Sequence, residues 1–297
     1  MFDERVFLSS FPDEQALYAH LRNIKHVALD MDGTIYKGNT LFPYTKQFLA
    51  DLTTMGIGYS FLTNNPSKST AGYLEHLGSM GVVATKKEIY TTAQATIAYL
   101  KTHHPEVKRL FILGTPSMIE EFELAGFVSV PNDPKEEPDA VVVGFDLTLA
   151  YDRLSRAAWW VSQNKLYVAT NPDYVCPTDE PVVLVDCGSI CAAIEKSVGR
   201  EPDVVLGKPQ PEMLNGILEL HHLKNEEVAM VGDRIYTDIL MAHRANSLGV
   251  LVLSGEATKE DAMKAVPRPN LVTPTIETFG ELLKRSRAIS RDYETNV

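Results

Sequence analysis

The sequence has 297 residues, of which 44% are hydrophobic and 23% charged, and its 28 basic and 39 acidic side chains give a formal net charge of −11. This composition is ordinary for a globular protein with a sizeable core. The acidic balance argues against a general binder of nucleic acids or anionic membranes, because both need clustered positive charge. No run approaches the roughly 18 apolar residues of a membrane span, and the first residues lack the pattern of a signal peptide. We therefore expect a cytoplasmic protein.

Short apolar runs alternate with helical patterns along the whole chain. The predicted strands are residues 26–30, 57–63, 109–114, 140–145, 166–170, 204–207, 228–232 and 249–253. Strands that are apolar throughout and alternate with helices predict an α/β fold, in which a parallel sheet is covered by helices on both faces.

Two of the helical segments have a clear apolar face and a glycine stop. In the first, Phe48, Leu49, Leu52 and Met55 precede Gly56. In the second, Ile190, Ala193, Ile194 and Val198 precede Gly199. We therefore predict helices that end at these two glycines.

Eight strands are many for one sheet, and the Pro- and acid-rich stretch at 130–139 is typical of an exposed connector. The strand ends with chemically suggestive residues lie in the outer thirds of the chain. We therefore predict a core domain formed by residues 1–90 and 190–297, with an inserted α/β domain at 91–189.

Three cysteines, Cys176, Cys187 and Cys191, are an odd number in a long chain. They do not resemble a secreted disulfide framework, and two sulfurs four residues apart make a poor zinc site. We expect all three to be reduced.

Polar side chains follow four of the predicted strands, at the ends where parallel sheets bind ligands. They are Asp30 and Asp32, Thr63 and Asn64, Lys208, and Asp233 and Asp238. Taken singly, each has an ordinary interpretation, since an Asp after a strand often caps a turn or a helix. Together they offer carboxylates for a hard cation such as Mg²⁺, and a hydroxyl, turn N–H groups and an ammonium for phosphate oxygens. The combination predicts a magnesium- and phosphate-binding site.

The same residues, in the same order, resemble the motifs of the haloacid dehalogenase-like (HAD) phosphohydrolases. Residues 30–34, DMDGT, match the D-x-D-x-T motif, and Thr63, Lys208 and Gly232-Asp233…Asp238 match the three later motifs. Stretches such as DMDGTIYKG, GKPQPEM and GDRIYTDI are similar to the branch with a large α/β cap, the NagD-like and 4-nitrophenylphosphatase-like enzymes. The resemblance implies a Rossmann-like parallel-sheet HAD core and an inserted α/β cap domain.

The resemblance also implies a role for each residue. Asp30 would be the nucleophile that forms an aspartyl-phosphate, and Asp32 the general acid and base. Mg²⁺ would be bound by Asp30, Asp233 and the main-chain carbonyl of Asp32. The remaining roles are phosphate binding by Thr63, the Asn64 N–H, Gly33 and Lys208, support by Asp238 and Thr34, and substrate contacts by Asn171, Asp173 and segment 144–152 of the cap. For Asn171 and Asp173 a simple turn is an equal alternative.

Other functions fit parts of the pattern. A dehalogenase would have no task for Asp32, because a halide leaves without a proton. A non-catalytic phosphate- or nucleotide-binding module would gain nothing from a carboxylate aimed at phosphorus. A phosphomutase stays open. The expected partner is a small phosphorylated metabolite of the nucleotide, sugar phosphate, phosphoglycolate or pyridoxal phosphate type, with no nucleic acid, and we expect a homodimer.

Overall fold

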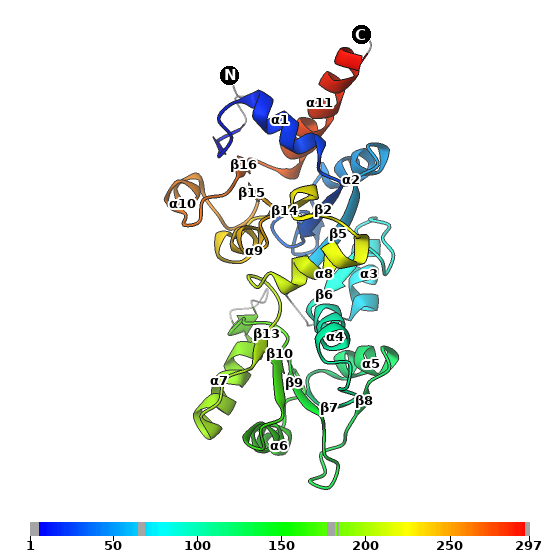
Figure 1. The fold of residues 1–297 in the computed structure, drawn as a ribbon, viewed down its shortest axis with the longest axis vertical. Helices are drawn as coiled ribbons and strands as arrows, with labels where there is room; N and C mark the ends of the chain where they lie inside the picture. The colour runs from blue at the N-terminus through cyan, green and yellow to red at the C-terminus, as the bar shows by residue number, and fades with distance from the viewer. Residues whose placement is uncertain (1–5, 65–68, 177–181, 183, 295–297) are drawn as a thin grey trace. The chain divides into compact units, whose positions relative to one another are not determined.

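A computed structural model describes residues 6–64, 69–176, 182 and 184–294 of the chain (Figure 1). By its internal contacts the chain forms two compact units. The first comprises Met1–Leu62, His76–Ile89 and Ile217–Val297, and the second comprises Thr63–Glu75 and Tyr90–Gly216. The predicted division into a core at 1–90 and 190–297 and an inserted domain at 91–189 stays a prediction.

The first unit is built on a sheet whose described strands follow the order β1-β16-β15-β14-β2-β5-β6. These strands are β1 (Leu8–Ser9), β2 (His26–Asp30), β5 (Gly58–Thr63), β6 (Ile89–Thr91), β14 (Val228–Gly232), β15 (Leu248–Val252) and β16 (Leu271–Thr273). The neighbours from β16 to β5 pair in parallel, whereas β1 runs antiparallel to β16. Every residue of β14 is buried, as expected of a central parallel strand.

The second unit contains a parallel sheet with the order β13-β10-β9-β7-β8 among the described residues. Its strands are β7 (Arg109–Leu113), β8 (Val128–Ser129), β9 (Ala140–Val143), β10 (Leu166–Ala169) and β13 (Val204–Val205). Alternate residues of the central strands enter two separate apolar clusters. Phe111 and Val141 pack with α6 (Tyr151–Ser162) and α7 (Cys187–Val198), and Ile112 and Val142 pack with α4 (Thr92–His103) and α5 (Pro116–Leu124). The sheet is therefore covered on both faces.

The remaining elements connect these strands. The helices are α1 (Glu14–Arg22), α2 (Thr45–Thr54), α3 (Thr70–Ser79), α4 (Thr92–His103), α5 (Pro116–Leu124), α6 (Tyr151–Ser162), α7 (Cys187–Val198), α8 (Glu212–His221), α9 (Leu240–Arg244), α10 (Lys259–Lys264) and α11 (Ile276–Glu294), with a 3₁₀ turn at Asn225–Glu227 and a π-helical turn at Ile235–Ile239. Among the described residues, two short antiparallel pairs are formed by β3 (Tyr36–Lys37) with β4 (Thr40–Leu41) and by β11 (Val175–Cys176) with β12 (Leu184–Val185). None of the described helices has the length and apolar character that crossing a bilayer requires.

The predicted α/β fold with parallel sheets is confirmed, and each predicted strand is present. The strands belong to two sheets, and the short strands β1, β6, β8 and β16 were not predicted because two or three residues give no periodicity. Helices α2 and α7 end next to Gly56 and Gly199, whose φ angles are +68° and +72°.

One residue departs from its predicted helix face. Ala193 is exposed, because α7 buries Cys187, Ile190, Cys191 and Ile194 instead. The sulfurs of Cys187 and Cys191 lie 4.0 Å apart inside this cluster and form no disulfide.

Candidate active site

The chain turns sharply after Asp30, the last residue of β2. Gly33 adopts a φ of +89°, a conformation that glycine reaches at little cost, and its N–H donates to the carbonyl of Tyr36 at 2.7 Å. The turn leads directly into the β3–β4 hairpin. Asp32 is exposed on this turn, and its Oδ1 accepts a hydrogen bond from the Gly38 N–H at 3.3 Å. The turn at residues 30–34 thus leaves the carboxyl of Asp32 exposed, two residues after the end of β2.

Asp233 follows β14 directly and is only 2% exposed. Its Oδ2 accepts a hydrogen bond from the Glu256 N–H at 2.7 Å. The π-helical turn then carries the chain to Asp238, which is completely buried and accepts from the Arg234 N–H at 3.1 Å. A side chain at Gly232 would lie 2.3 Å from the Asp238 carboxyl carbon, so the glycine makes room for this carboxylate. Both carboxylates are thus oriented by main-chain donors.

Asp30, Asp233 and Asp238 form the carboxylate cluster. Because β14 pairs with β2 in parallel, with Val231 opposite Leu29, the ends of the two strands coincide. One oxygen from each of the three carboxylates lies within 4.8 Å of the others. Three like charges at this distance cost free energy unless positive charge offsets them. Carboxylate oxygens are the ligands that Mg²⁺ prefers, so this donor set fits a magnesium ion.

Arg234 lies beside the cluster, and its Nε is 3.0 Å from Oε2 of Glu256. Burial, the largest single influence, disfavours the charged guanidinium. The combined effect of neighbouring Tyr236, Asp30, Asp233 and Glu256 nevertheless raises the pKa of Arg234 above its ordinary value. This arginine therefore stays a cation at the edge of the cluster.

In the second unit, the side-chain amide of Asn64 pairs with the main chain at Lys208. Asn64 Nδ2 donates to the Lys208 carbonyl at 2.7 Å, and Asn64 Oδ1 accepts from the Lys208 N–H at 2.7 Å. Lys208 is only 4% exposed. Just before it, Gly207 has a φ of +79°, and a Cβ there would lie 3.0 Å from Asn64 Oδ1. We call this two-bond contact the Asn64 clamp.

The clamp continues into a network of polar side chains. Asn64 Nδ2 also donates to Asp173 at 3.0 Å, and Asn171 Nδ2 reaches Asp173 at 3.4 Å and Asp186 at 3.2 Å. Asp186 caps α7 by accepting from the Cys187 N–H at 2.6 Å. Its pKa is raised to about 6, mainly by burial, although the bonds from Cys187 and Asn171 oppose the shift. The side chains of Asn171 and Asp173 thus form hydrogen bonds with other side chains of this network.

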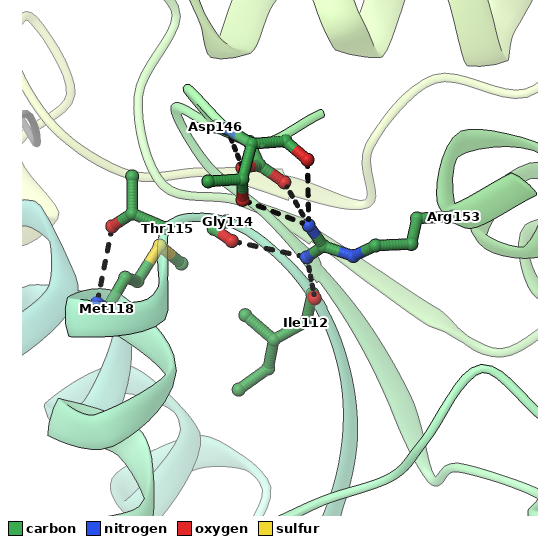
Figure 2. A network of polar contacts seen from close by, with 7 residues as sticks. Ile112, Gly114, Thr115, Met118, Asp146 and Arg153 are labelled. Carbon is green, nitrogen blue, oxygen red and sulfur yellow. Dashed lines mark hydrogen bonds and ion pairs between the residues drawn. The ribbon is translucent and has the colours of Figure 1, made fainter. Parts of the chain in front are cut away.

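A second network fixes the segment after β9 (Figure 2). The Arg153 guanidinium donates to Asp146 at 2.8 Å and to the carbonyls of Ile112 and Gly114, each at 3.2 Å. The other carboxylate oxygen of Asp146 accepts from the N–H and hydroxyl of Thr148, at 2.8 and 2.7 Å. Asp146 lies inside the predicted cap segment 144–152, and these contacts give it a structural role.

Several predicted site residues have surroundings that the sequence does not reveal. Asp238 was predicted to support the metal ligands without being one of them, and its carboxylate lies in the cluster itself. The Thr34 hydroxyl is buried and has no hydrogen-bond partner among the described residues, so the turn is held by main-chain bonds such as Thr34 N–H to Met31 O at 3.2 Å. Thr63 Oγ1 lies 3.4 Å from the Tyr73 hydroxyl.

Sequence reasoning missed Arg234, Ser254, Glu256 and Asp186. A signal for two of them was available, because Ser254 and Glu256 directly follow the predicted strand 249–253 at the same sheet edge. Arg234 lies between Asp233 and Asp238 in the sequence, and no role was predicted for it. Nothing in the local pattern marks Asp186, whose partners come from Asn171 and the start of α7.

Family models match both ends of the chain. A haloacid dehalogenase-like hydrolase model matches residues 27–128, and a HAD-hydrolase-like model matches residues 205–279. The first match includes the turn after β2, and the second includes Lys208, Asp233 and Asp238.

Individual proteins are similar over most of the chain. Ribonucleotide monophosphatase NagD of Escherichia coli K12 is 32% identical over 253 residues, which are 85% of this chain and 97% of that protein. The structure of 4-nitrophenylphosphatase from Thermotoga maritima is 38% identical with a TM-score of 0.82, covering 88% of this chain and 98% of that one. Glycerol phosphate phosphatase from Mycobacterium tuberculosis, in complex with magnesium, is 29% identical with a TM-score of 0.78, covering 86% and 77%.

Proposed function

This chain belongs to the haloacid dehalogenase-like hydrolases and is a phosphatase of that family, and from this premise we propose that it hydrolyses small organic phosphates through an aspartyl-phosphate at Asp30 with Mg²⁺. The observation that carries the proposal is the carboxylate cluster, whose oxygens lie within 4.8 Å of one another at one sheet edge. The exposed carboxyl of Asp32, two residues after Asp30, adds an acid that water and substrate can reach.

Asp30 of the cluster and the nearby Asp32 supply the groups for a two-step displacement. In the first step an Asp30 oxygen bonds to phosphorus while the bond from phosphorus to the leaving oxygen breaks, and Asp32 gives that oxygen a proton. In the second step the Asp32 carboxylate takes a proton from water, the water oxygen bonds to phosphorus, and the bond to Asp30 breaks. The products are an alcohol, inorganic phosphate and the regenerated Asp30 carboxylate.

Mg²⁺, when bound, supplies positive charge that reduces repulsion between the Asp30 carboxylate and the phosphate dianion. We assign its binding to the carboxylates of Asp30 and Asp233 and the main-chain carbonyl of Asp32. Asp238 would orient bound water. Its carboxylate is itself held in place by the Arg234 N–H, which donates to Oδ2 at 3.1 Å. Support for a magnesium requirement comes from the oxygen-only donor set, two of whose three carboxylates are buried, and from the magnesium complex of the mycobacterial relative.

Phosphate binding is assigned to four residues of the chain: Gly33, Thr63, Asn64 through its N–H, and Lys208. A hydroxyl, main-chain N–H groups and an ammonium offset the negative charge that phosphoryl oxygens carry in the transition state. We propose a small phosphorylated metabolite as the substrate, of the nucleotide, sugar phosphate, phosphoglycolate or pyridoxal phosphate type. A screen of such esters ranked by kcat/KM identifies it.

The mechanism is tested by hydrolysis of 4-nitrophenyl phosphate with Mg²⁺, with EDTA, and in the variant Asp30→Asn. We expect EDTA and the substitution each to lower kcat by at least about 1,000-fold, because the nucleophile and its charge partner are both needed. Asp13→Asn is the matched control, since Asp13 only caps α1 by accepting from the Ala16 N–H, and asparagine caps equally well.

Metal-independent turnover, or wild-type activity in Asp30→Asn, would sink the mechanism. The predicted homodimer and the cytoplasmic location remain predictions. A monomeric mass by light scattering at micromolar concentration would refute the dimer.

A further inference from the structure

The loop that follows β15 contacts both halves of the carboxylate edge. Ser254 Oγ donates to the Gly33 carbonyl at 2.7 Å, and the Glu256 N–H donates to Asp233 Oδ2 at 2.7 Å. The Ala257 N–H also donates to the Asp233 carbonyl, at 3.2 Å. Gly33 and Asp233 are 200 residues apart in sequence, and one four-residue loop therefore bonds to both.

The same loop packs so closely against the Asp233 carboxylate that no side chain fits between them. A Cβ at Gly255 would lie 1.9 Å from Asp233 Oδ2, and a Cβ at Gly33 would lie 2.4 Å from the same oxygen. The carboxylate thus lies between two glycines, one from the turn after β2 and one from the loop. Any larger residue at Gly255 must push Asp233 out of its present place.

Glu256 is anchored from a third segment. Its Oε2 lies 3.0 Å from Arg234 Nε and accepts a hydrogen bond from the Tyr236 hydroxyl at 3.1 Å. These exposed contacts are individually weak. They nevertheless tie the donor for Asp233 to the residue that follows Asp233 in the chain, so the loop and the π-helical turn form one closed ring of contacts.

We propose that Ser254, Gly255 and Glu256 are the positioning element of the magnesium site, holding the Asp233 carboxylate and the Gly33 turn in the geometry that binds the cation. This inference rests on the proposed function, because it assigns the cation site to the carboxylate cluster. A charge-assisted hydrogen bond from a main-chain N–H fixes the rotation of a ligating carboxylate, and such outer partners typically contribute about 10- to 100-fold in metal affinity.

The test is isothermal titration calorimetry of the purified wild type and variants with Mg²⁺ alone. We expect Gly255→Ala to weaken Mg²⁺ binding by about 100-fold and Ser254→Ala by about 10-fold, in line with the effect of outer partners of metal ligands. Ser254→Thr keeps the hydroxyl and should bind Mg²⁺ within about 3-fold of the wild type. Gly78→Ala is the matched glycine control, because a Cβ there meets nothing within 4 Å, and we expect no change.

A second readout separates positioning from loss of structure. At saturating Mg²⁺, the kcat of Ser254→Ala should recover to within about 3-fold of the wild type, because the defect lies in metal affinity. Wild-type Mg²⁺ affinity in Ser254→Ala, or equal losses in Ser254→Thr and Ser254→Ala, would overturn the proposal. If Gly255→Ala does not fold, the two serine variants decide the matter. A wild type that binds no Mg²⁺ but hydrolyses phosphate esters would overturn this inference and the metal part of the proposed function, while leaving the hydrolase intact.

Discussion

The carboxylates that follow the strands of the two units are arranged in opposite ways. In the first unit, Asp30, Asp233 and Asp238 converge within 4.8 Å of one another. In the second, Asp146 and Asp186 lie in different networks, each matched by side-chain donors, Arg153 for one and Asn171 for the other. Clustered like charges suit a bound cation, whereas dispersed and paired charges suit a scaffold. The comparison separates the carboxylates that we propose bind the cation from structural ones that occupy similar strand ends.

The largest effect that sharpens this comparison is expected at Arg153. The Asp146 side chain is fully buried and its arginine partner is 22% exposed, so Arg153→Leu leaves a buried carboxylate with too few donors. We expect a loss of about 3 kcal/mol in the free energy of unfolding, measured with urea. Arg109→Leu is the control, because its pair with Glu136 is 40% and 46% exposed and should contribute less than about 1 kcal/mol. Equal losses in both variants would contradict the structural role.

The Asn64 clamp connects the polar network of the second unit to Lys208, which we propose binds phosphate. Asn64→Leu removes both hydrogen bonds to the Lys208 main chain, and we expect kcat/KM to fall by about 100-fold, because small displacements of a positioning group are costly. Asn132→Leu deletes an exposed amide whose side-chain hydrogen bonds, among the described residues, go to Asp152 and Arg156, and should leave kcat/KM within about 3-fold. A folded Asn64→Leu protein with normal kinetics would remove the clamp from the site.

The first unit should lose stability in acid through His26. Burial, and then the neighbouring His221, lower the pKa of His26 to about 3. Because the unfolded imidazole has a pKa near 6.5, its contribution is present above that pH and is lost as pH falls toward the folded value, about 2 kcal/mol by pH 5. His26→Gln should flatten the pH dependence of urea unfolding between pH 7 and 5. The exposed His103→Gln variant should keep the wild-type slope, and an unchanged slope in His26→Gln would contradict the assignment.

The second unit should respond to acid in the opposite direction, through Asp186. Its folded pKa of about 6 lies above the value of 3.8 for an unperturbed aspartate, so its ionised form opposes folding. This penalty is full above pH 6 and shrinks as the pH falls from about 6 to 3.8. Asp186→Asn removes the charge and can still cap α7. We expect a gain of about 1 kcal/mol at pH 7.5 and about half of that at pH 5, measured by thermal unfolding. A loss at both values would show that the charge stabilises α7.

Much of the fold could be predicted because its signals are local. Apolar runs such as those of β2, β9 and β14 are buried on both faces, and the glycines at 56 and 199 end helices through their positive φ angles. Short strands such as β1 and β8, and the exposure of Ala193, could not be predicted, because they depend on which neighbour an element finds in space.

The sequence by itself determined the chemistry at the sheet edge, because parallel strands end together and the motif residues follow those ends. Only the tertiary structure decided how these residues are held. It places the Asp238 carboxylate inside the cluster and the Asp233 carboxylate between Gly33 and Gly255. It also brings the Asn64 side chain into hydrogen-bonding contact with the Lys208 main chain. These contacts join residues as many as 208 positions apart (238 − 30), and no local pattern encodes which distant donor reaches which acceptor.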